Sequence, residues 1–154
     1  MIIPMMMMLA APIVVAADGQ WSTLRQGRTC EAASRSTGAS QKDRPPARAS
    51  VSFDAGGPRH GQFSARLSRL PRAGATVMLY VGEQPFLLMT KDDTAWSRGP
   101  KQEQAIIAAM RNSGGMRVEA RSPGGGRIVD RYMLDGAPLA IDAAAACAAA
   151  LVNH

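Results

Sequence analysis

The chain has 154 residues, with 18 Lys and Arg, 12 Asp and Glu, and 2 Cys, so its formal net charge is +6. This length suits one domain, and the balance of apolar and polar residues excludes both a polytopic membrane protein and a disordered chain. Two cysteines are too few for a Cys-rich zinc module or a disulfide-dense miniprotein.

The first 17 residues form an apolar segment without a charged side chain. The segment ends in Val15-Ala16-Ala17, which is typical of a secretory signal with small residues at its cleavage site. We therefore expect residues 1–17 to be a signal peptide that is removed after Ala17. One alternative is an uncleaved anchor, although 17 helical residues span only about 26 Å. The other is a soluble protein whose start is misassigned.

Four consecutive methionines, Met5 to Met8, lie inside this segment. Thioether groups bind Cu(I), so the run is compatible with a copper site. The simpler interpretation is that methionine fills the apolar core of a signal peptide, and we expect no metal site here.

Residues 18–154 are expected to form a single domain that begins with short strands. A strand is predicted at 20–24, with Trp21 and Thr23 on one face, and Cys30 follows shortly. The polar, Pro-rich residues at about 34–50 are typical of a long flexible loop. Further strands are predicted at residues 51–53, 63–67, 75–81 and 86–89, from alternating or continuous apolar runs between turn residues.

The second half of the chain combines two helices with a hairpin. Pro100 suits the first position of a helix that carries Ile106 and Met110 on one face and stops at Ser113-Gly114-Gly115. Alternation in 116–121 and in 127–134 predicts a hairpin around the Gly-rich residues 123–126. The fold class expected is therefore α+β, a mostly antiparallel, sandwich-like β domain with one mid-chain helix and an Ala-rich C-terminal helix.

The C-terminal helix is predicted at about 138–152. Four of its residues lie four positions apart and form an apolar stripe that we expect to face the body of the protein. These residues are Leu139, Ala143, Cys147 and Leu151.

The two cysteines are predicted to form the only disulfide, between Cys30 and Cys147. In an exported chain two lone cysteines usually pair, and this bridge would tie the two ends of the domain together. The alternative is a reactive or metal-binding thiol, but the sequence has no C-x-x-C motif and no histidine near either cysteine.

No motif indicates catalysis or cofactor binding. His60 is the one internal histidine. It could act as a general base together with an Asp and a Ser, but no nucleophile motif accompanies it in the sequence. An exposed loop histidine is therefore the simpler interpretation. Asp92-Asp93 lacks the further acidic residues of a calcium loop and suits a turn between strands. Gly124-Gly125-Gly126 lacks the Lys-Ser/Thr of a phosphate-binding loop. We expect no enzyme activity, no cofactor and no metal.

Four arginines, Arg59, Arg66, Arg69 and Arg72, make a basic stretch and are the candidate binding residues. Such a stretch could neutralise the phosphates of nucleic acid, but no aromatic residues interleave with it and no nucleic-acid motif is present. A solvated basic face is one interpretation. Contact with an anionic envelope surface or a protein partner is the other.

The order of these features resembles the invasion-associated locus B family of exported bacterial proteins. The resemblance rests on an apolar leader, Trp21 shortly before Cys30, antiparallel strands, and Leu134-Asp135-Gly136 opening an Ala-rich helix that carries Cys147. Ala137 stands where the family usually has Phe, and the second internal cysteine pair of many members is missing. The resemblance implies a periplasmic or secreted, non-catalytic envelope protein and transfers no catalytic residue.

Together these observations predict an exported bacterial protein that binds an anionic or protein partner. After processing it is not expected to span a membrane, and we expect a monomer that binds no nucleic acid. Two other functions stay open. One is an inhibitor of an envelope enzyme that inserts residues 34–50 or 123–127, and the other is a small exported hydrolase that uses His60.

Overall fold

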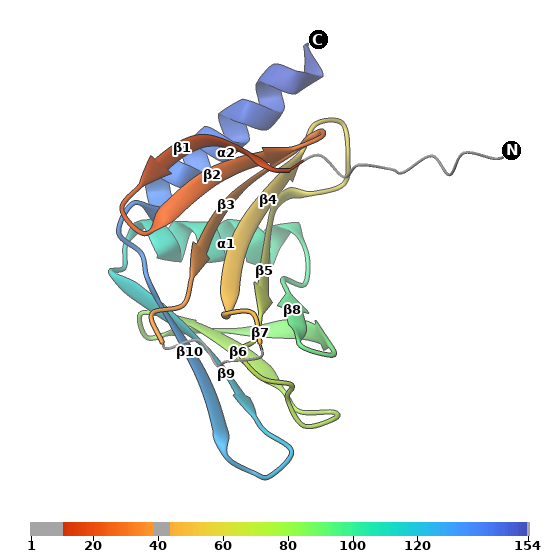
Figure 1. The fold of residues 1–154 in the computed structure, drawn as a ribbon, viewed down its shortest axis with the longest axis vertical. Coiled ribbons are helices and arrows are strands. Elements are labelled where there is room, and N and C mark those ends of the chain that lie inside the picture. Colours follow the sequence, from red (N-terminus) through yellow and green to blue (C-terminus); the bar gives the residue numbers. More distant parts are fainter. Residues whose placement is uncertain (1–10, 39–43, 154) are drawn as a thin grey trace, which may run out of the picture.

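The computed structural model describes residues 11–38 and 44–153, and within them the chain forms ten strands and two helices (Figure 1). The strands are β1 (Ile13–Asp18), β2 (Trp21–Gln26), β3 (Thr29–Arg35), β4 (Arg48–Asp54), β5 (His60–Arg66), β6 (Val77–Val81), β7 (Gln84–Lys91), β8 (Thr94–Trp96), β9 (Gly115–Arg121) and β10 (Arg127–Met133). The helices are α1 (Pro100–Arg111) and α2 (Ala137–Val152).

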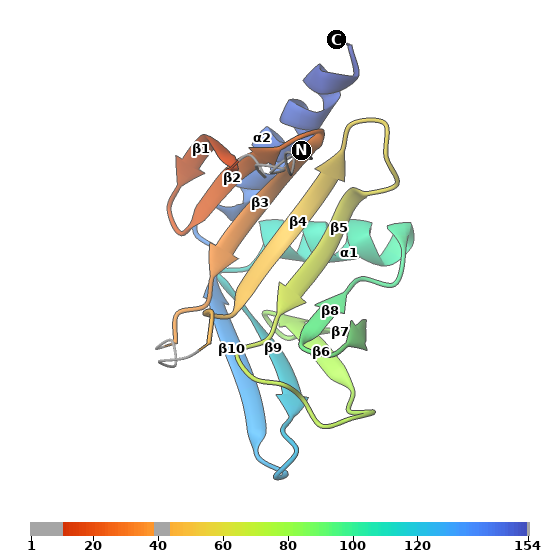
Figure 2. The same ribbon diagram turned by 45° about the vertical axis from the view of Figure 1, so that its right-hand side comes forward.

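All ten strands belong to one antiparallel sheet in the order β1-β2-β3-β4-β5-β8-β7-β6-β9-β10. The sheet curls so that β1–β5 and β6–β10 face a common interior, and both helices lie on one side of it, behind β2–β5 in Figure 2. Helix α2 packs on β1–β4, and α1 packs on β5, β6 and β7. The predicted fold class, α+β with a mid-chain helix and an Ala-rich C-terminal helix, is confirmed, and its sandwich-like arrangement takes the form of a half-barrel.

The core lies inside the curl, and β5, β6, β9 and β10 contribute to it by alternation, whereas β3 and β4 bury consecutive residues. Phe63 and Ala65 of β5, Leu79 of β6 and Val118 of β9 are buried, while their sequence neighbours face outward. Ile106 from α1 packs into the same cluster. Because large aromatic side chains are few, small alanines on β3, β4 and α2 let the helices approach the sheet closely.

Three strands were not predicted, and the loop expected at about 34–50 is shorter than expected. Its ends belong to β3 and β4, which reach Arg35 and start again at Arg48. Serines and arginines in these strands look like loop residues in the sequence, yet Ser34 and Ser50 are buried in the ladder. Residues 39–43 of the predicted loop lie outside the described residues. The strands without a sequence prediction are β1, β3 and β8.

Helix α2 buries a different stripe from the predicted one. Its buried residues are Ala137, Ala140, Ile141, Ala144 and Ala148, whereas Leu139 is 62% exposed. Residues four apart drift by about 40° per step around a helix, so a stripe with spacings of three and four stays on the sheet better. Cys147 lies at the edge of the buried stripe and is partly buried.

The last part of the predicted signal peptide forms a strand in this chain. Residues 13–17 belong to β1, which pairs with β2 at the edge of the sheet, and residues 1–10 lie outside the described residues. Neither helix of the described chain has the length and apolar character needed to cross a membrane.

Candidate functional site

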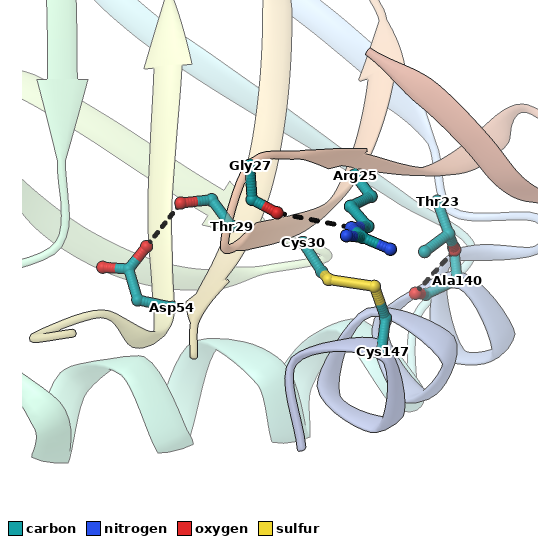
Figure 3. The surroundings of a disulfide bond; sticks show 8 residues. All are labelled: Thr23, Arg25, Gly27, Thr29, Cys30, Asp54, Ala140 and Cys147. Carbon is teal, nitrogen blue, oxygen red and sulfur yellow. Dashed lines mark hydrogen bonds between the residues drawn. A yellow bond between two sulfur atoms is a disulfide. The ribbon is translucent and has the colours of Figure 1, made fainter. Parts of the chain in front are cut away.

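The predicted disulfide is present, with Cys30 and Cys147 joined at 2.03 Å. Figure 3 shows that it connects the start of β3 to α2, close to the turn between β2 and β3. The two cysteines are 117 residues apart, so the bridge ties the N-terminal strands to the last helix. A disulfide of this kind points to an oxidising compartment.

Polar groups beside the disulfide are matched by partners. The hydroxyl of Thr23 donates to the carbonyl of Ala140 at 3.0 Å, which fixes β2 to α2. The Thr29 hydroxyl donates to Asp54 Oδ1 at 2.7 Å (Figure 3). The Arg59 guanidinium binds both oxygens of the same carboxylate, at 3.0 Å to Oδ2 and 2.9 Å to Oδ1. These hydrogen bonds, that of Arg59 first, lower the pKa of Asp54 to about 2.

A cleft opens at the opposite end of β4 and β5. It has a volume of about 460 Å³ and lies between the residues after β3, the segment that follows β5, and β10. A smaller hollow of about 240 Å³ shares Pro45, Ser68 and Arg69 with it. We call the two together the arginine cleft, because arginines line both of them: Arg44, Arg66, Arg69, Arg127 and Arg131.

The segment that carries Arg69 is held by backbone hydrogen bonds to three neighbouring parts of the sheet. The amide of Leu67 donates to the carbonyl of Asp93 at 2.8 Å, and the amide of Arg72 donates to the carbonyl of Arg121. Between them, the amide of Ser68 donates to Asp130 Oδ2 at 2.9 Å. Asp130 is a buried carboxylate on the inner face of β10, so it fixes the position of the segment that borders the cleft.

Four guanidinium groups of the cleft, those of Arg44, Arg66, Arg69 and Arg131, have no carboxylate partner among the described residues. Arg66 donates to the carbonyl of Pro46, and Arg69 donates to the carbonyl of Arg127, each at 3.1 Å. The ion pairs of the described chain include neither of them, nor Arg131. Arg127 differs, because its guanidinium is paired with Glu119. Two carboxylates, Asp93 and Asp130, also line the cleft, but no ion pair within the described residues joins them to its arginines. With five arginines against two aspartates, the lining of the cleft carries an excess of positive charge.

Two buried polar atoms close to the cleft lack a hydrogen-bond partner within the described part of the chain: Arg66 Nε and the hydroxyl of Tyr132. Burial, and then the charge of Asp130, raise the pKa of Tyr132 far above its usual value, while Arg66 acts in the opposite direction. Tyr132 is therefore neutral at ordinary pH. Buried groups without partners are rare in folded proteins, and they concentrate at sites with a role beyond packing.

The structure divides the four arginines predicted as binding residues. Arg66 and Arg69 line the arginine cleft. Arg59 lies at the other end of β5, where it forms an ion pair with Asp54. At the usual rise per residue of a β-strand, it is roughly 20 Å from Arg66. Arg72 is exposed and lines neither part of the cleft.

Sequence reasoning missed Arg44, Arg127 and Arg131. Arg127, Val129 and Arg131 alternate with buried residues of β10, so the sequence does place them on the outer face. The sequence does not predict how the sheet curls, and this curl brings β10 next to the segment that follows β5.

Of the other candidate residues, Asp93 lines the smaller hollow of the arginine cleft, and His60 and Asp92 lie apart from the cleft. His60 is exposed at the start of β5, and no hydrogen bond within the described residues joins its ring to an acid or a hydroxyl. Asp92 and Asp93 form the turn between β7 and β8, as predicted, with Asp92 at φ 55°. No group of three or more His, Cys, Asp or Glu side chains within the described residues could hold a metal ion.

Comparison with known proteins gives no relative: no family model, no curated protein and no solved structure matches the chain.

Proposed function

We propose that this chain is an exported, non-catalytic binding protein of the bacterial envelope, and that its arginine cleft binds an anionic group of a partner. The disulfide supports an oxidising compartment, and the apolar leader supports export into the periplasm or beyond the cell. The resemblance to the invasion-associated locus B family supports the same assignment.

One observation carries the proposal: Arg66, Arg69 and Arg131 border one cleft without a carboxylate partner in the described chain. A guanidinium group offers a planar fork of donors that matches the oxygens of a phosphate or a carboxylate. Carbonyl partners hold Arg66 and Arg69 in place, so less side-chain entropy is lost when an anion binds.

The shape of the site narrows the class of ligand. A cleft of about 460 Å³ with an adjoining hollow accommodates a headgroup or a short acidic segment rather than a flat surface. The shared chemistry is a phosphate or carboxylate group, which an anionic lipid, a lipopolysaccharide or a free anion can supply.

The test compares two triple variants of the full chain that remove the same charge. The cleft variant carries Arg66→Gln, Arg69→Gln and Arg131→Gln. The control variant carries Arg25→Gln, Arg72→Gln and Arg98→Gln, three arginines outside the cleft that form no ion pair within the described chain.

Binding is measured to phosphatidylglycerol vesicles, to lipopolysaccharide and to inorganic phosphate, at low and at high salt. We expect the cleft variant to lose about tenfold or more in affinity, and the control variant to lose about threefold or less. Affinity should fall as salt rises. Equal losses in the two variants would mean that general charge attraction explains binding, and the proposal would be wrong. Competition by free phosphate distinguishes a free anion from a lipid-bound one.

A further inference from the structure

The edge strand β1 is paired with the sheet along one edge only, and α2 packs against it. It pairs antiparallel with β2, from Ile13 opposite Arg25 to Asp18 opposite Trp21, and it is the first strand of the sheet order. Its large side chains are exposed: Ile13 by 60%, Val14 by 62% and Val15 by 48%. None of the buried core residues comes from β1.

Strand β2, in contrast, is anchored without the help of β1. The indole of Trp21 donates to the carbonyl of Met133 at 2.8 Å, and the hydroxyl of Thr23 donates to the carbonyl of Ala140 at 3.0 Å. Both side chains are fully buried, and β3 pairs with the other edge of β2. If β1 is absent, β2 keeps these contacts and presents an unpaired row of N–H and C=O groups.

The start of β2 is also fixed. The amide of Gln20 donates to the carbonyl of Asp135 at 3.2 Å. Gly19, between β1 and β2, has φ +56°, and a Cβ there would lie 2.6 Å from the same carbonyl oxygen. The turn is therefore held against the start of α2, and the direction of β2 does not depend on the strand before it.

We propose that the free edge of β2 is a docking edge for an extended, uncharged segment of a partner protein, which takes the place that Ile13–Ala17 occupies in the full chain. This inference rests on the proposed export, because removal after Ala17 cuts β1 two residues before the turn at Gly19. Export would then expose the edge that the leader covers.

The chemistry of the occupant follows from the strand that sits there. Residues 13–17 read Ile-Val-Val-Ala-Ala, without charge and with a high β propensity. Val14 lies opposite Leu24, and Ala17 lies opposite Ser22, so the neighbouring positions on β2 suit small and branched apolar side chains.

A second copy of this chain does not suit the same edge. Helix α2 packs on β1 as well as on β2, so it extends over the place next to β2 (Figure 1). In an antiparallel pair of two β2 strands, both copies of α2 would lie on the same side of the joined sheet and compete for that space. A slim extended segment avoids this conflict.

The test uses a chain that begins at Asp18, the full chain, and a synthetic peptide of residues 12–17 with blocked ends. The chain that begins at Asp18 retains every buried side chain of the core, so its fold is checked first by near-ultraviolet circular dichroism of its tryptophans, Trp21 and Trp96. We expect the peptide to bind this chain saturably and to slow hydrogen exchange of the β2 amides that face β1 by about tenfold or more. The full chain should not bind the peptide.

The control peptide carries Val14→Pro and Ala16→Pro, at two positions that are in register with β2, which removes backbone donors and prevents strand pairing. Absence of peptide binding to the folded short chain, equal binding of the control peptide, or a dimer joined through β2 would each overturn the proposal. If the short chain does not fold, the full chain with Val14→Pro and Ala16→Pro serves instead, because these changes unpair β1 without removing it. N-terminal sequencing of the exported protein tests processing separately, so a failure of export is distinguished from a failure of docking.

Discussion

The two ends of the β4–β5 hairpin differ in the partners of their charged side chains. At the end near the disulfide, Asp54 accepts hydrogen bonds from Thr29 and Arg59, and Thr23 donates to Ala140. At the arginine cleft, the hydrogen bonds that Arg66 and Arg69 donate within the described residues go to carbonyl oxygens. The comparison teaches that charge alone does not mark a binding site. Arg59 at the disulfide end is paired with a carboxylate of the fold, whereas Arg66 and Arg69 at the cleft form no ion pair within the described residues.

The largest expected effect comes from breaking the disulfide end. Replacing Cys30 or Cys147 with Ser opens a cross-link across 117 residues. The chain-entropy treatment of such a loop predicts a loss of up to about 5 kcal/mol in the free energy of unfolding. The measurement is urea denaturation of each single variant and of the double variant.

The double variant should be little less stable than either single one, because each change removes the same bond. Unchanged stability in both single variants would contradict the structural role of the bridge. Mass spectrometry of peptides from the non-reduced protein provides the control, since two free thiols would show that the bridge does not form.

The next effect is expected from Thr23→Val, which removes one hydroxyl while preserving the shape of the side chain. The hydroxyl donates to the carbonyl of Ala140 in a buried setting, so its loss should lower the free energy of unfolding by about 1–2 kcal/mol. Urea denaturation measures the change. Stability equal to that of the unmodified chain would mean that this bond does not help to hold β2 against α2.

A smaller effect, dependent on pH, is expected from Asp54→Asn. The pKa of Asp54 is lowered to about 2 in the folded chain, so its ion pair stabilises the fold above the ordinary carboxyl value of about 4. That advantage should be lost as the pH falls from about 4 through 2. We expect the unmodified chain to exceed the variant in the free energy of unfolding by about 1 kcal/mol at neutral pH, since the pair is partly exposed, by less than half of that near pH 2, and by nothing well below pH 2.

The measurement is the difference in the free energy of unfolding between the two chains across this pH range. A difference that stays constant from pH 7 to pH 2 would show that Asp54 does not act through its charge.

The smallest effect is expected at the cleft end, from Tyr132→Phe. The hydroxyl of Tyr132 is buried and has no hydrogen-bond partner within the described residues. Its removal should therefore change the free energy of unfolding by less than about 0.5 kcal/mol, or raise it slightly. Thr23→Val is the matched comparison, because each change removes one buried hydroxyl. A loss at Tyr132 as large as the loss at Thr23 would remove the contrast between the two ends.

The sequence predicts individual strands and helices better than it predicts which of them lie side by side in the fold. Alternation predicted β5, β9 and β10, and the proline and the flanking glycines predicted α1. Strand β3 escaped prediction because Ala, Ser and Thr do not distinguish a buried strand from a loop without their partners. The disulfide was predictable because only one pair of cysteines exists.

The cleft was predictable only in part. Arg66 and Arg69 are close in sequence, so they were grouped, but Arg59 was grouped with them and belongs to the other end of β5. Arg131 joins them through the curl of the sheet, about 60 residues later, and no local pattern encodes that approach. Nor does the sequence reveal that Asp54, rather than a partner, neutralises Arg59.

The most direct test of the central claim, that the arginine cleft and not the disulfide end binds anions, is an NMR titration of the full chain. Inositol hexakisphosphate serves as a soluble polyphosphate probe, and the signals followed are backbone amides and arginine Nε groups. We predict saturable shifts at Ser68, Arg69 and Arg131, with Arg59 and Arg25 unchanged. Shifts of equal size at Arg59 and Arg69, or shifts confined to the disulfide end, would contradict the account.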